Sequence, residues 1–406
     1  MIDRRLLLTA AALSPTTALA QAPKKRPVTP ARPRKPAETA ANGPPATPAQ
    51  TPLGPVDTSA KWAVIIDYNT GATLLNKDAD VPMVPSSMTK LMTAYIVYGM
   101  LKSGRLKLDQ ELPVSEKAWR MQGSKMFVGL GTKVKVEDLI RGMIVQSGND
   151  ACIVLAEAIA GSEDQFVDLM NEKAKVLGLQ QSHFRNATGW PDPGHRMSVR
   201  DIAVVAQHLI REFPEYYKYD SEKSFKYNNI DQLNRNTLVQ KNLADGLKTG
   251  HTEEGGYGLV ASADRGGRRV IVVLNGMASM HQRGAEGEKL LEWAFREWEN
   301  VTLFTAAETV EKMPVWLGTA QTVPLVTGRD VVLTLPRAWR NTLKVDLAYE
   351  SPIRAPVLRG TALGTLSVRG AGVPDADIKL LAGADVPKLG LPGRAMAVLA
   401  RYMGRS

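Results

Sequence analysis

The sequence is poor in cysteine. Cys152 is the only cysteine among 406 residues, so an intramolecular disulfide cannot form. Apolar residues follow it from Ile153 to Ala156, and this setting favours a small buried side chain on a helix over a reactive thiol. The sequence therefore indicates a structural role for this cysteine.

Long apolar runs and paired histidines are absent as well. No stretch is long and apolar enough to form a permanent transmembrane helix. The histidines make no ligand pair at helical or β spacing, which disfavours a metal-dependent peptidase; they are His183, His195, His208, His251 and His281. We expect neither a metal ion nor a cofactor.

The chain carries a formal net charge of +10, and much of this charge is local. Between Gln21 and Pro55, only Glu38 opposes the basic residues Lys24, Lys25, Arg26, Arg32, Arg34 and Lys35. The chain shows no zinc-finger spacing, RNA-binding signature or alternation of basic and aromatic residues, so we expect no nucleic acid partner. Attraction to anionic wall polymers or to a membrane surface explains the same charge.

The first 57 residues are predicted to lie outside the folded domains. Residues 1–20 are typical of an export signal, with Arg4 and Arg5 before an apolar run and small residues at the cleavage point. The mature chain then begins near Gln21. Residues 21–57 are rich in Pro, Ala, Thr and basic residues, which bury too little apolar area to offset chain ordering, so we predict a disordered tether.

A folded α+β domain is predicted over residues 58–304. Two hairpins are expected, the first over Trp62–Asp67 and Ala72–Leu75, the second over Tyr257–Ala263 and Arg269–Leu274. Helices are expected from just after Pro85 to Leu101, over Val136–Val145, over Asn149–Ala160 and over Glu286–Trp298.

The C-terminal hundred residues have a different sequence pattern. After about Phe304, short apolar runs alternate with Gly and Pro, which predicts a small all-β domain over residues 305–388. Residues 389–406 predict an amphipathic helix on which Arg394, Arg401 and Arg405 lie beside an apolar arc. Such a helix either docks on its own domain or attaches to a membrane surface, and its basic face favours the membrane.

Ser87-Met88-Thr89-Lys90 is the first of three motifs that carry chemistry. It lies where Pro85 gives way to the apolar helix, so the Ser87 and Lys90 side chains project from one face a turn apart. A serine hydroxyl needs a base to attack a carbonyl, and a lysine amine acts as a base only when it is unprotonated. Burial and a second nearby cation would lower the pKa of Lys90 toward that state.

Two further motifs follow along the chain. Ser147-Gly148-Asn149 lies between two predicted helices, where Ser147 and Asn149 are either site residues or helix caps. Lys248-Thr249-Gly250 follows the run from Leu243 to Leu247, which predicts an edge strand whose Gly250 lets a substrate backbone approach, before a turn into His251. Each motif alone is weak, but Ser-x-x-Lys, Ser-x-Asn and Lys-Thr-Gly in this order are the signature set of penicillin-binding proteins and serine β-lactamases.

The residues around the motifs narrow this resemblance. They read PSSMTKLMT from Pro85, QSGNDAC from Gln146 and DGLKTGHT from Asp245. On these segments the chain resembles the D-alanyl-D-alanine carboxypeptidase family of low-molecular-mass penicillin-binding proteins, from about Lys61 to Trp298. The β-rich region and the basic tail are similar in layout to the family's C-terminal domain and membrane anchor, whereas the Pro-rich tether does not belong to the family core.

The resemblance implies a serine β-lactamase-like fold, an antiparallel five-stranded sheet flanked by helices, with the site between the sheet and the helices. It implies Ser87 as nucleophile, Lys90 as general base and Ser147 as a proton relay to the leaving amine together with Lys248. On the substrate it implies contacts from Asn149 to the acyl side, and from Lys248, Thr249 and Arg235 to the terminal carboxylate. Gly250 and His251 complete the last motif, and the backbone N–H groups of Ser87 and His251 would bind the oxyanion.

The implied activity is two-step acyl transfer, which removes the terminal D-Ala from peptidoglycan stem pentapeptides through an acyl-enzyme on Ser87. The implied partners are this peptide, β-lactam antibiotics and a membrane surface, at the periplasmic face of the inner membrane. A class A β-lactamase carries Ser-Asp-Asn where this chain has Ser147-Gly148-Asn149. A D,D-endopeptidase of the same superfamily stays an alternative. So does a non-catalytic wall-binding protein, although degraded motifs would be expected there and all three are intact.

Overall fold

The computed structural model describes residues 47–338, 342–370 and 373–403. The predicted signal peptide and residues 21–46 of the predicted tether lie outside these ranges. The prediction that the disordered tether extends to residue 57 is wrong for residues 47–57. Strand β1 (Thr47–Ala49) pairs with strand β2 (Val56–Thr58) in this segment. Ala49 is fully buried and Val56 packs against the same apolar cluster, so this segment buries apolar surface and folds with the domain.

A five-stranded antiparallel sheet forms the centre of the first domain, in the order β4-β3-β11-β10-β9. Its strands are β3 (Trp62–Asp67), β4 (Thr73–Lys77), β9 (Gly246–Thr252), β10 (Gly256–Arg265) and β11 (Arg268–Met277). The two predicted hairpins are β3–β4 and β10–β11. Strand β3 also pairs with β11, so the middle of the sheet joins the beginning of the domain to its end.

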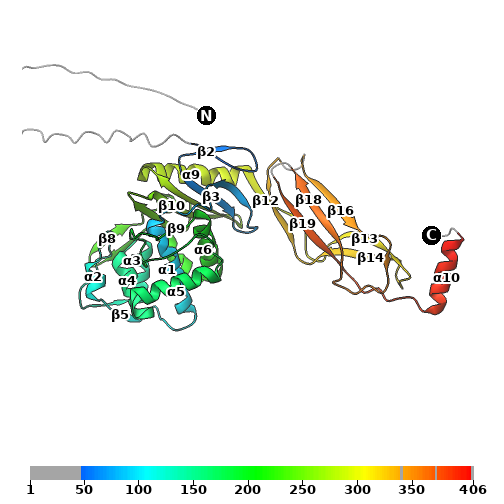
Figure 1. Cartoon of the computed structure of the whole chain (residues 1–406), viewed down its shortest axis with the longest axis horizontal. Helices are drawn as coiled ribbons and strands as arrows, with labels where there is room; N and C mark the ends of the chain where they lie inside the picture. The colour runs from blue at the N-terminus through cyan, green and yellow to red at the C-terminus, as the bar shows by residue number, and fades with distance from the viewer. Residues whose placement is uncertain (1–46, 339–341, 371–372, 404–406) are drawn as a thin grey trace, which may run out of the picture. The chain divides into compact units, whose positions relative to one another are not determined.

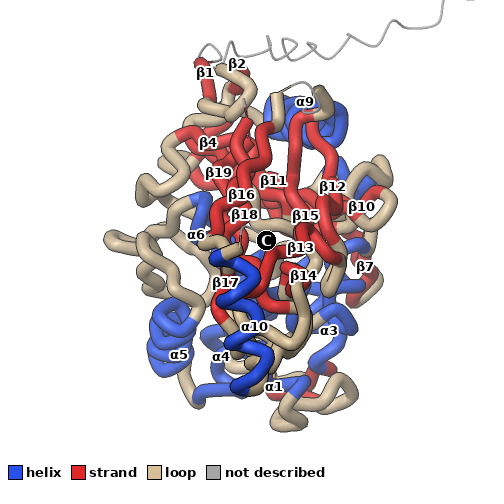
Figure 2. Tube along the Cα trace, turned by 90° about the vertical axis from the view of Figure 1, so that its right-hand side faces the viewer, coloured by secondary structure: helices blue, strands red, loops and turns tan. Residues whose placement is uncertain are grey.

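Helices cover both faces of this sheet, as Figures 1 and 2 show. Helix α9 (Met280–Glu297) lies on one face, and α1 (Lys90–Lys102), α3 (Val136–Ile144), α4 (Asn149–Ala160) and α6 (Val199–Glu212) form the layer on the other. Strand β3 serves both layers because successive side chains alternate: Ala63 and Ile65 join the cluster under α9, Val64 and Ile66 the cluster around α1. The predicted α+β architecture is confirmed.

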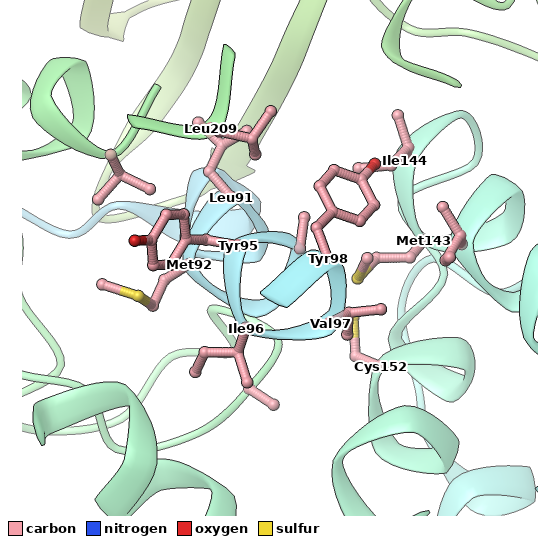
Figure 3. Close-up of a cluster of buried hydrophobic side chains, with 14 of the residues drawn as sticks. Leu91, Met92, Tyr95, Ile96, Val97, Tyr98, Met143, Ile144, Cys152 and Leu209 are labelled. Carbon is pink, nitrogen blue, oxygen red and sulfur yellow. The ribbon is translucent and has the colours of Figure 1, made fainter. Parts of the chain in front are cut away.

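Helix α1 is surrounded by apolar side chains. Figure 3 shows Leu91, Tyr95 and Tyr98 pointing in different directions around the helix, toward side chains of neighbouring helices. Cys152 of α4 belongs to the same cluster and is fully buried, as predicted for a structural thiol. A helix packed on all sides cannot shift easily, so the residues at its N-terminal end are held in fixed positions.

Helix α9 begins earlier than the sequence predicted, at Met280 rather than Glu286. The Ser279 side chain caps it by accepting a hydrogen bond from the Gln282 N–H. The first turns of the helix lack the regular apolar spacing on which the prediction depended, so the predicted start was too late.

Shorter elements connect these layers. They are η1 (Ser86–Thr89), β5 (Glu111–Pro113), α2 (Glu116–Arg120), β6 (Lys133–Lys135), α5 (Glu163–Val176), α7 (Pro214–Tyr217), η2 (Lys218–Ser221), β7 (Ser224–Tyr227), β8 (Ile230–Leu233) and α8 (Thr237–Gln240). Helix α6 is capped by the Ser198 hydroxyl, which accepts from the Asp201 N–H.

The C-terminal domain is all-β, as expected. Strand β12 (Trp298–Phe304) pairs with β15 (Val331–Pro336), and a six-stranded sheet has the order β16-β18-β19-β14-β13-β17. The six strands are β13 (Thr309–Trp316), β14 (Thr322–Thr327), β16 (Lys344–Tyr349), β17 (Ile353–Arg354), β18 (Ala362–Gly370) and β19 (Val373–Ala382). Because β12 pairs only with a strand of this domain, the predicted boundary at residue 304 moves back to Glu297.

The described chain ends in helix α10 (Leu391–Tyr402). Its exposed apolar side chains are Leu391, Met396, Val398, Leu399, Tyr402 and, just beyond it, Met403. Arg405 of the predicted basic face lies outside the described residues. Within the described ranges, no helix has the length and apolarity needed to cross a bilayer.

Candidate functional site

Ser87 and Lys90 lie where the chain enters helix α1. Pro85 precedes the short helix η1, which leads directly into α1 and places Ser87 one turn before Lys90. The Lys90 Nζ atom lies 2.9 Å from the Ser87 Oγ atom, within hydrogen-bond distance. The sequence predicted this contact from the three-residue spacing.

The Lys90 amine is fully buried and has two more partners. It donates to the Asn149 Oδ1 atom at 2.8 Å and to the Thr188 carbonyl oxygen at 2.6 Å. The pKa of Lys90 is lowered to about 8, mainly by burial and also by the Arg235 cation, against the opposing effects of Cys152 and Asp150. A neutral amine keeps two N–H groups for Asn149 and Thr188, and its lone pair then faces the Ser87 hydroxyl. This arrangement suits an amine that takes a proton from the serine.

Ser147 lies in the tight connection between α3 and α4. It has a left-handed backbone with φ of 61°, which is uncommon for a residue other than glycine and concentrates at functional sites. Its hydroxyl is buried and makes no hydrogen bond to any described residue. Gly148 is the N-cap of α4 and no side chain caps that helix, so Ser147 and Asn149 are not the capping residues that the sequence left open.

Lys248 lies on β9, the edge strand of the sheet next to η1. Its side chain is almost completely buried, and its Nζ atom lies a distant 3.5 Å from the Thr249 carbonyl oxygen. Burial lowers the pKa of Lys248 well below its usual value, and the neighbouring cations Lys90 and Arg235 lower it further. The sequence predicted a turn after Lys-Thr-Gly, which is wrong, because β9 continues through His251 to Thr252 and pairs with β10.

Gly250 lies where the strand of Lys248 meets the start of the nucleophile helix. A Cβ atom built on it would lie 3.0 Å from the Pro85 carbonyl oxygen, 3.1 Å from Ser86 Cβ and 3.3 Å from Met88 Cγ. The start of the nucleophile helix therefore lies close to Gly250, which also lines a cavity at Ser87. The small residue lets the strand of Lys248 pack directly against the turn of Ser87.

Two cavities meet at Ser87. One of about 540 Å³ is lined by Ser87, Gly123, Ser124, Ser147, Arg235, Thr249, Gly250, His251, Tyr257, Met280 and Arg283. The other, of about 590 Å³, is lined by Ser87, Gly123, Ser124, Asn149, Thr188, Gly189, Trp190, Pro191, His251, Thr252, Glu253 and Glu254. The first is bordered by two arginines and the second by two glutamates, so an extended ligand that crosses Ser87 meets opposite charges at its two ends.

Two known families of protein sequences match this chain. The sequence model of D-alanyl-D-alanine carboxypeptidase matches residues 46–278, more than half of the chain, and the model of the penicillin-binding protein 5 C-terminal domain matches residues 298–388. The chain belongs to the D-alanyl-D-alanine carboxypeptidase family.

Relatives cover both domains. The D-alanyl-D-alanine carboxypeptidase DacA of Escherichia coli is 40% identical over 317 residues, 76% of this chain and 79% of the relative. DacF of Bacillus subtilis is 36% identical over 358 residues, 85% of this chain and 89% of the relative. Among solved structures, penicillin-binding protein 5 of Haemophilus influenzae has a TM-score of 0.74 at 36% identity, covering 83% of this chain and 100% of that one.

Several residues of this carboxypeptidase site were not found from the sequence. Arg283 of α9 is buried, lines the first cavity and donates from Nη2 to the Arg235 carbonyl oxygen at 2.8 Å. Thr188 supplies a carbonyl to Lys90, and Trp190 lines the second cavity. None of them lies in a short motif that indicates a site.

His251 and Arg235 lie at the cavity as predicted. The His251 ring stacks on Tyr257 with 3.9 Å between ring centroids, and burial and the Arg283 cation lower its pKa. Arg235 donates from Nη1 to the Ser124 Oγ atom at 2.5 Å. In the described part of the chain, no cluster of three or more His, Cys, Asp or Glu side chains is arranged to hold a metal ion.

Proposed function

We propose that this chain is a serine-type D-alanyl-D-alanine carboxypeptidase that removes the terminal D-Ala from peptidoglycan stem pentapeptides. The observation that carries the proposal is the 2.9 Å contact between the Ser87 hydroxyl and the buried Lys90 amine, whose pKa is lowered to about 8. A nucleophile touching a base of this pKa is prepared for acyl transfer near neutral pH.

The first step forms the acyl-enzyme. The Ser87 hydroxyl gives its proton to Lys90 while its oxygen bonds to the carbonyl carbon of the D-Ala-D-Ala peptide bond. The C–N bond then breaks, and the proton that Lys90 took passes through Ser147 and Lys248 to the leaving amine, so Lys90 is neutral again. The unpartnered Ser147 hydroxyl at the cavity supports this relay, because it is free to bond to a ligand. Backbone N–H groups of Ser87 and His251 would hold the oxyanion.

The second step releases the product. Water attacks the acyl carbon and gives a proton to Lys90. The bond from that carbon to Ser87 Oγ then breaks, and Lys90 returns the proton to the serine oxygen. Asn149 supports both steps by holding the Lys90 amine, and its other amide contact is to the Gln122 carbonyl oxygen at 2.7 Å. Its remaining amide hydrogen is left for the acyl side of the substrate.

The leaving D-Ala carries a free carboxylate, which needs cations and donors around it. Arg235 and Thr249 line the cavity, and Lys248 is buried on the strand that carries Thr249. This supports carboxylate binding on the β9 side of Ser87, with the acyl chain in the second cavity. The stem pentapeptide and β-lactams, whose carboxylate has a similar place, are the proposed ligands; the relative penicillin-binding protein D2 of Listeria monocytogenes was solved in an ampicillin-bound form.

Mass spectrometry after exposure to benzylpenicillin tests the proposal. The intact protein should gain the mass of one penicillin, and Ser87→Ala should gain none while it keeps its melting temperature. Release of free D-Ala from a pentapeptide should exceed cleavage of a cross-linked dimer, which is the outcome that separates a carboxypeptidase from a D,D-endopeptidase. A wild-type protein that folds but takes up no penicillin contradicts the assignment.

We also infer that the mature chain works outside the cytoplasm, at the periplasmic face of the inner membrane, with α10 lying on the membrane surface. The exposed Leu391, Met396 and Leu399 support attachment over docking on the chain's own domain, because a docked helix would cover them. Sedimentation with anionic vesicles measures this attachment. Binding should be lost when residues 389–406 are deleted, and penicillin labelling should remain.

A further inference from the structure

The segment 185–190 brings a backbone carbonyl into the catalytic site, although it belongs to no helix or strand. Its Thr188 carbonyl oxygen accepts from the Lys90 Nζ atom at 2.6 Å. The other partners of that amine, Ser87 and Asn149, are held by η1 and α4. A carbonyl in an irregular segment has no helix or sheet hydrogen bonds to fix its direction, so another contact must set the direction of the Thr188 carbonyl.

The side chain of Asn186 provides this contact. Its Oδ1 atom accepts from the backbone N–H of Gly189 at 2.8 Å and from that of Trp190 at 3.0 Å. The same oxygen lies 3.2 Å from the Thr188 nitrogen and 3.1 Å from the Thr188 hydroxyl. The Nδ2 atom donates to the Trp190 carbonyl oxygen at 2.9 Å. An asparagine that bonds to the backbone ahead of it closes a turn, so one side chain holds the whole turn around Thr188.

Asn186 and Lys90 bind opposite edges of one peptide plane. The Thr188 carbonyl and the Gly189 N–H belong to the same peptide bond, which is planar and directs its C=O and N–H to opposite sides. Because the N–H donates to Asn186, the C=O points away from Asn186 and toward Lys90. A rotation of this plane would break both hydrogen bonds together. The direction of the carbonyl that Lys90 contacts is therefore set by the Asn186 side chain.

The residues on either side of this plane are fixed to the helices of the site. The Ala187 carbonyl oxygen accepts from the Thr93 hydroxyl of α1 at 2.7 Å. Gly189 lies so close to the turn before the nucleophile that a Cβ atom built on it would overlap the Ser86 carbonyl. The segment is thus attached to α1 through one residue and packed on η1 through another, and Asn186 orients the peptide plane between these two points.

We propose that Asn186 is a positioning residue for the general base: it orients the Thr188 carbonyl, and this carbonyl fixes the direction of the Lys90 amine. The inference rests on the proposed function and deepens it. When the two N–H groups of the neutral amine are engaged by Thr188 and Asn149, its lone pair is directed at the Ser87 hydroxyl. If the carbonyl turns away, one N–H is released and the amine rotates, so its lone pair faces the serine for a smaller fraction of the time. Both steps of the reaction use this amine and should slow together.

Steady-state release of D-Ala from an N-acylated D-Ala-D-Ala peptide by the full chain tests this role. Asn186→Ala should lower kcat at least about tenfold, because a displacement of a catalytic group by about 1 Å can cost about 100-fold in rate. KM should change by a smaller factor than kcat, since Asn186 lines neither of the two cavities at Ser87. Trp190→Leu should show the opposite split, because it removes a ring that lines the second cavity and keeps the backbone hydrogen bonds of the turn.

Two matched variants separate positioning from a loss of stability. Asn186→Asp keeps the acceptor oxygen for Gly189, so it should recover most of the lost kcat at about pH 9, where the Lys90 amine with its pKa of about 8 is mainly neutral. Asn171→Ala loosens the same segment at Phe184, which Asn171 holds through bonds of 2.9 and 3.0 Å, and should lower the melting temperature while kcat is kept. Equal losses of kcat in Asn186→Ala and Asn171→Ala, or an unchanged kcat in Asn186→Ala, overturn the inference.

Hydrogen exchange of the wild type covers the case in which Asn186→Ala does not fold. The amide hydrogens of Gly189 and Trp190 should exchange at least about tenfold more slowly than those of an unstructured peptide, because each donates to the Asn186 side chain. Exchange at the unprotected rate overturns the inference. These outcomes leave the proposed function standing, which fails separately if the wild type is not acylated by benzylpenicillin at any pH.

Discussion

The lowered pKa of Lys90 makes a prediction about where acylation stops responding to pH. If Lys90 takes the Ser87 proton, the rate follows the neutral fraction of its amine. Raising the pH is therefore the simplest perturbation, because it converts Lys90 to its active form without changing any residue.

The magnitude follows from the pKa of about 8. At pH 7 the neutral fraction is about 9%, compared with about 0.03% for a lysine at its ordinary pKa of 10.5, roughly a 300-fold difference. The rate should rise about tenfold per pH unit up to pH 7 and level off just above pH 8. The sign follows from burial, which disfavours the ammonium and so brings the neutral form to lower pH.

Stopped-flow measurement of acylation by a fluorescent penicillin gives this profile, because the carboxylate of the antibiotic stays ionised throughout. Thermal melts at each pH show that the fold is retained. Lys90→Arg is the matched control, since a guanidinium keeps the charge but stays protonated, and it should abolish labelling at every pH. A rate that is flat between pH 6 and 8, or that still climbs tenfold per unit at pH 10, refutes the reasoning.

Two more predictions concern residues whose contacts with the site became apparent only in the structure. Arg283→Gln removes a buried cation from the carboxylate side of the cavity, so the KM for a D-Ala-D-Ala peptide should rise about tenfold or more with a smaller change in kcat, as steady-state kinetics would show; an unchanged KM excludes a contact with the ligand. Gly189→Ala places a Cβ atom on the Ser86 carbonyl oxygen, while Gly178→Ala, at a similar positive φ, meets open space. Thermal unfolding should show about 1 kcal/mol lost at Gly178 and distinctly more at Gly189, together with weaker penicillin labelling; equal losses at both positions contradict the packing argument.

Much of the fold was predictable because its signals are local. A few neighbouring residues are enough to indicate several elements. Examples are the apolar run after Pro85, the hairpin with Gly266-Gly267 at its turn and the helix cap at Ser198. The tether boundary and the start of α9 were wrong because they depend on partners elsewhere in the chain. Residues 47–57 form a local pair of strands, and this pair also bridges to Asn76 and packs on the cluster of distant strands.

The site likewise contains residues that local spacing predicts and residues that it does not. Ser87 and Lys90 were predictable as a pair, because one helical turn fixes their distance. Thr188 and Arg283 act on the site through a carbonyl and a guanidinium that tertiary packing brings in, and no local spacing indicates them. The packing of Gly250 against the turn of Ser87 could not be predicted for the same reason, since the sequence does not tell which backbone approaches it.

The pairing of β3 with β11 has a consequence for when the enzyme can fold. Strand β3 gains its inner neighbour only after residue 277 has been synthesised, roughly 210 residues later, which takes about 10 to 40 seconds of translation. During that interval the first strands have no completed sheet to join. A chain whose central sheet cannot be completed until late in synthesis stays unfolded for longer. An unfolded chain is the form that passes through a narrow translocation channel.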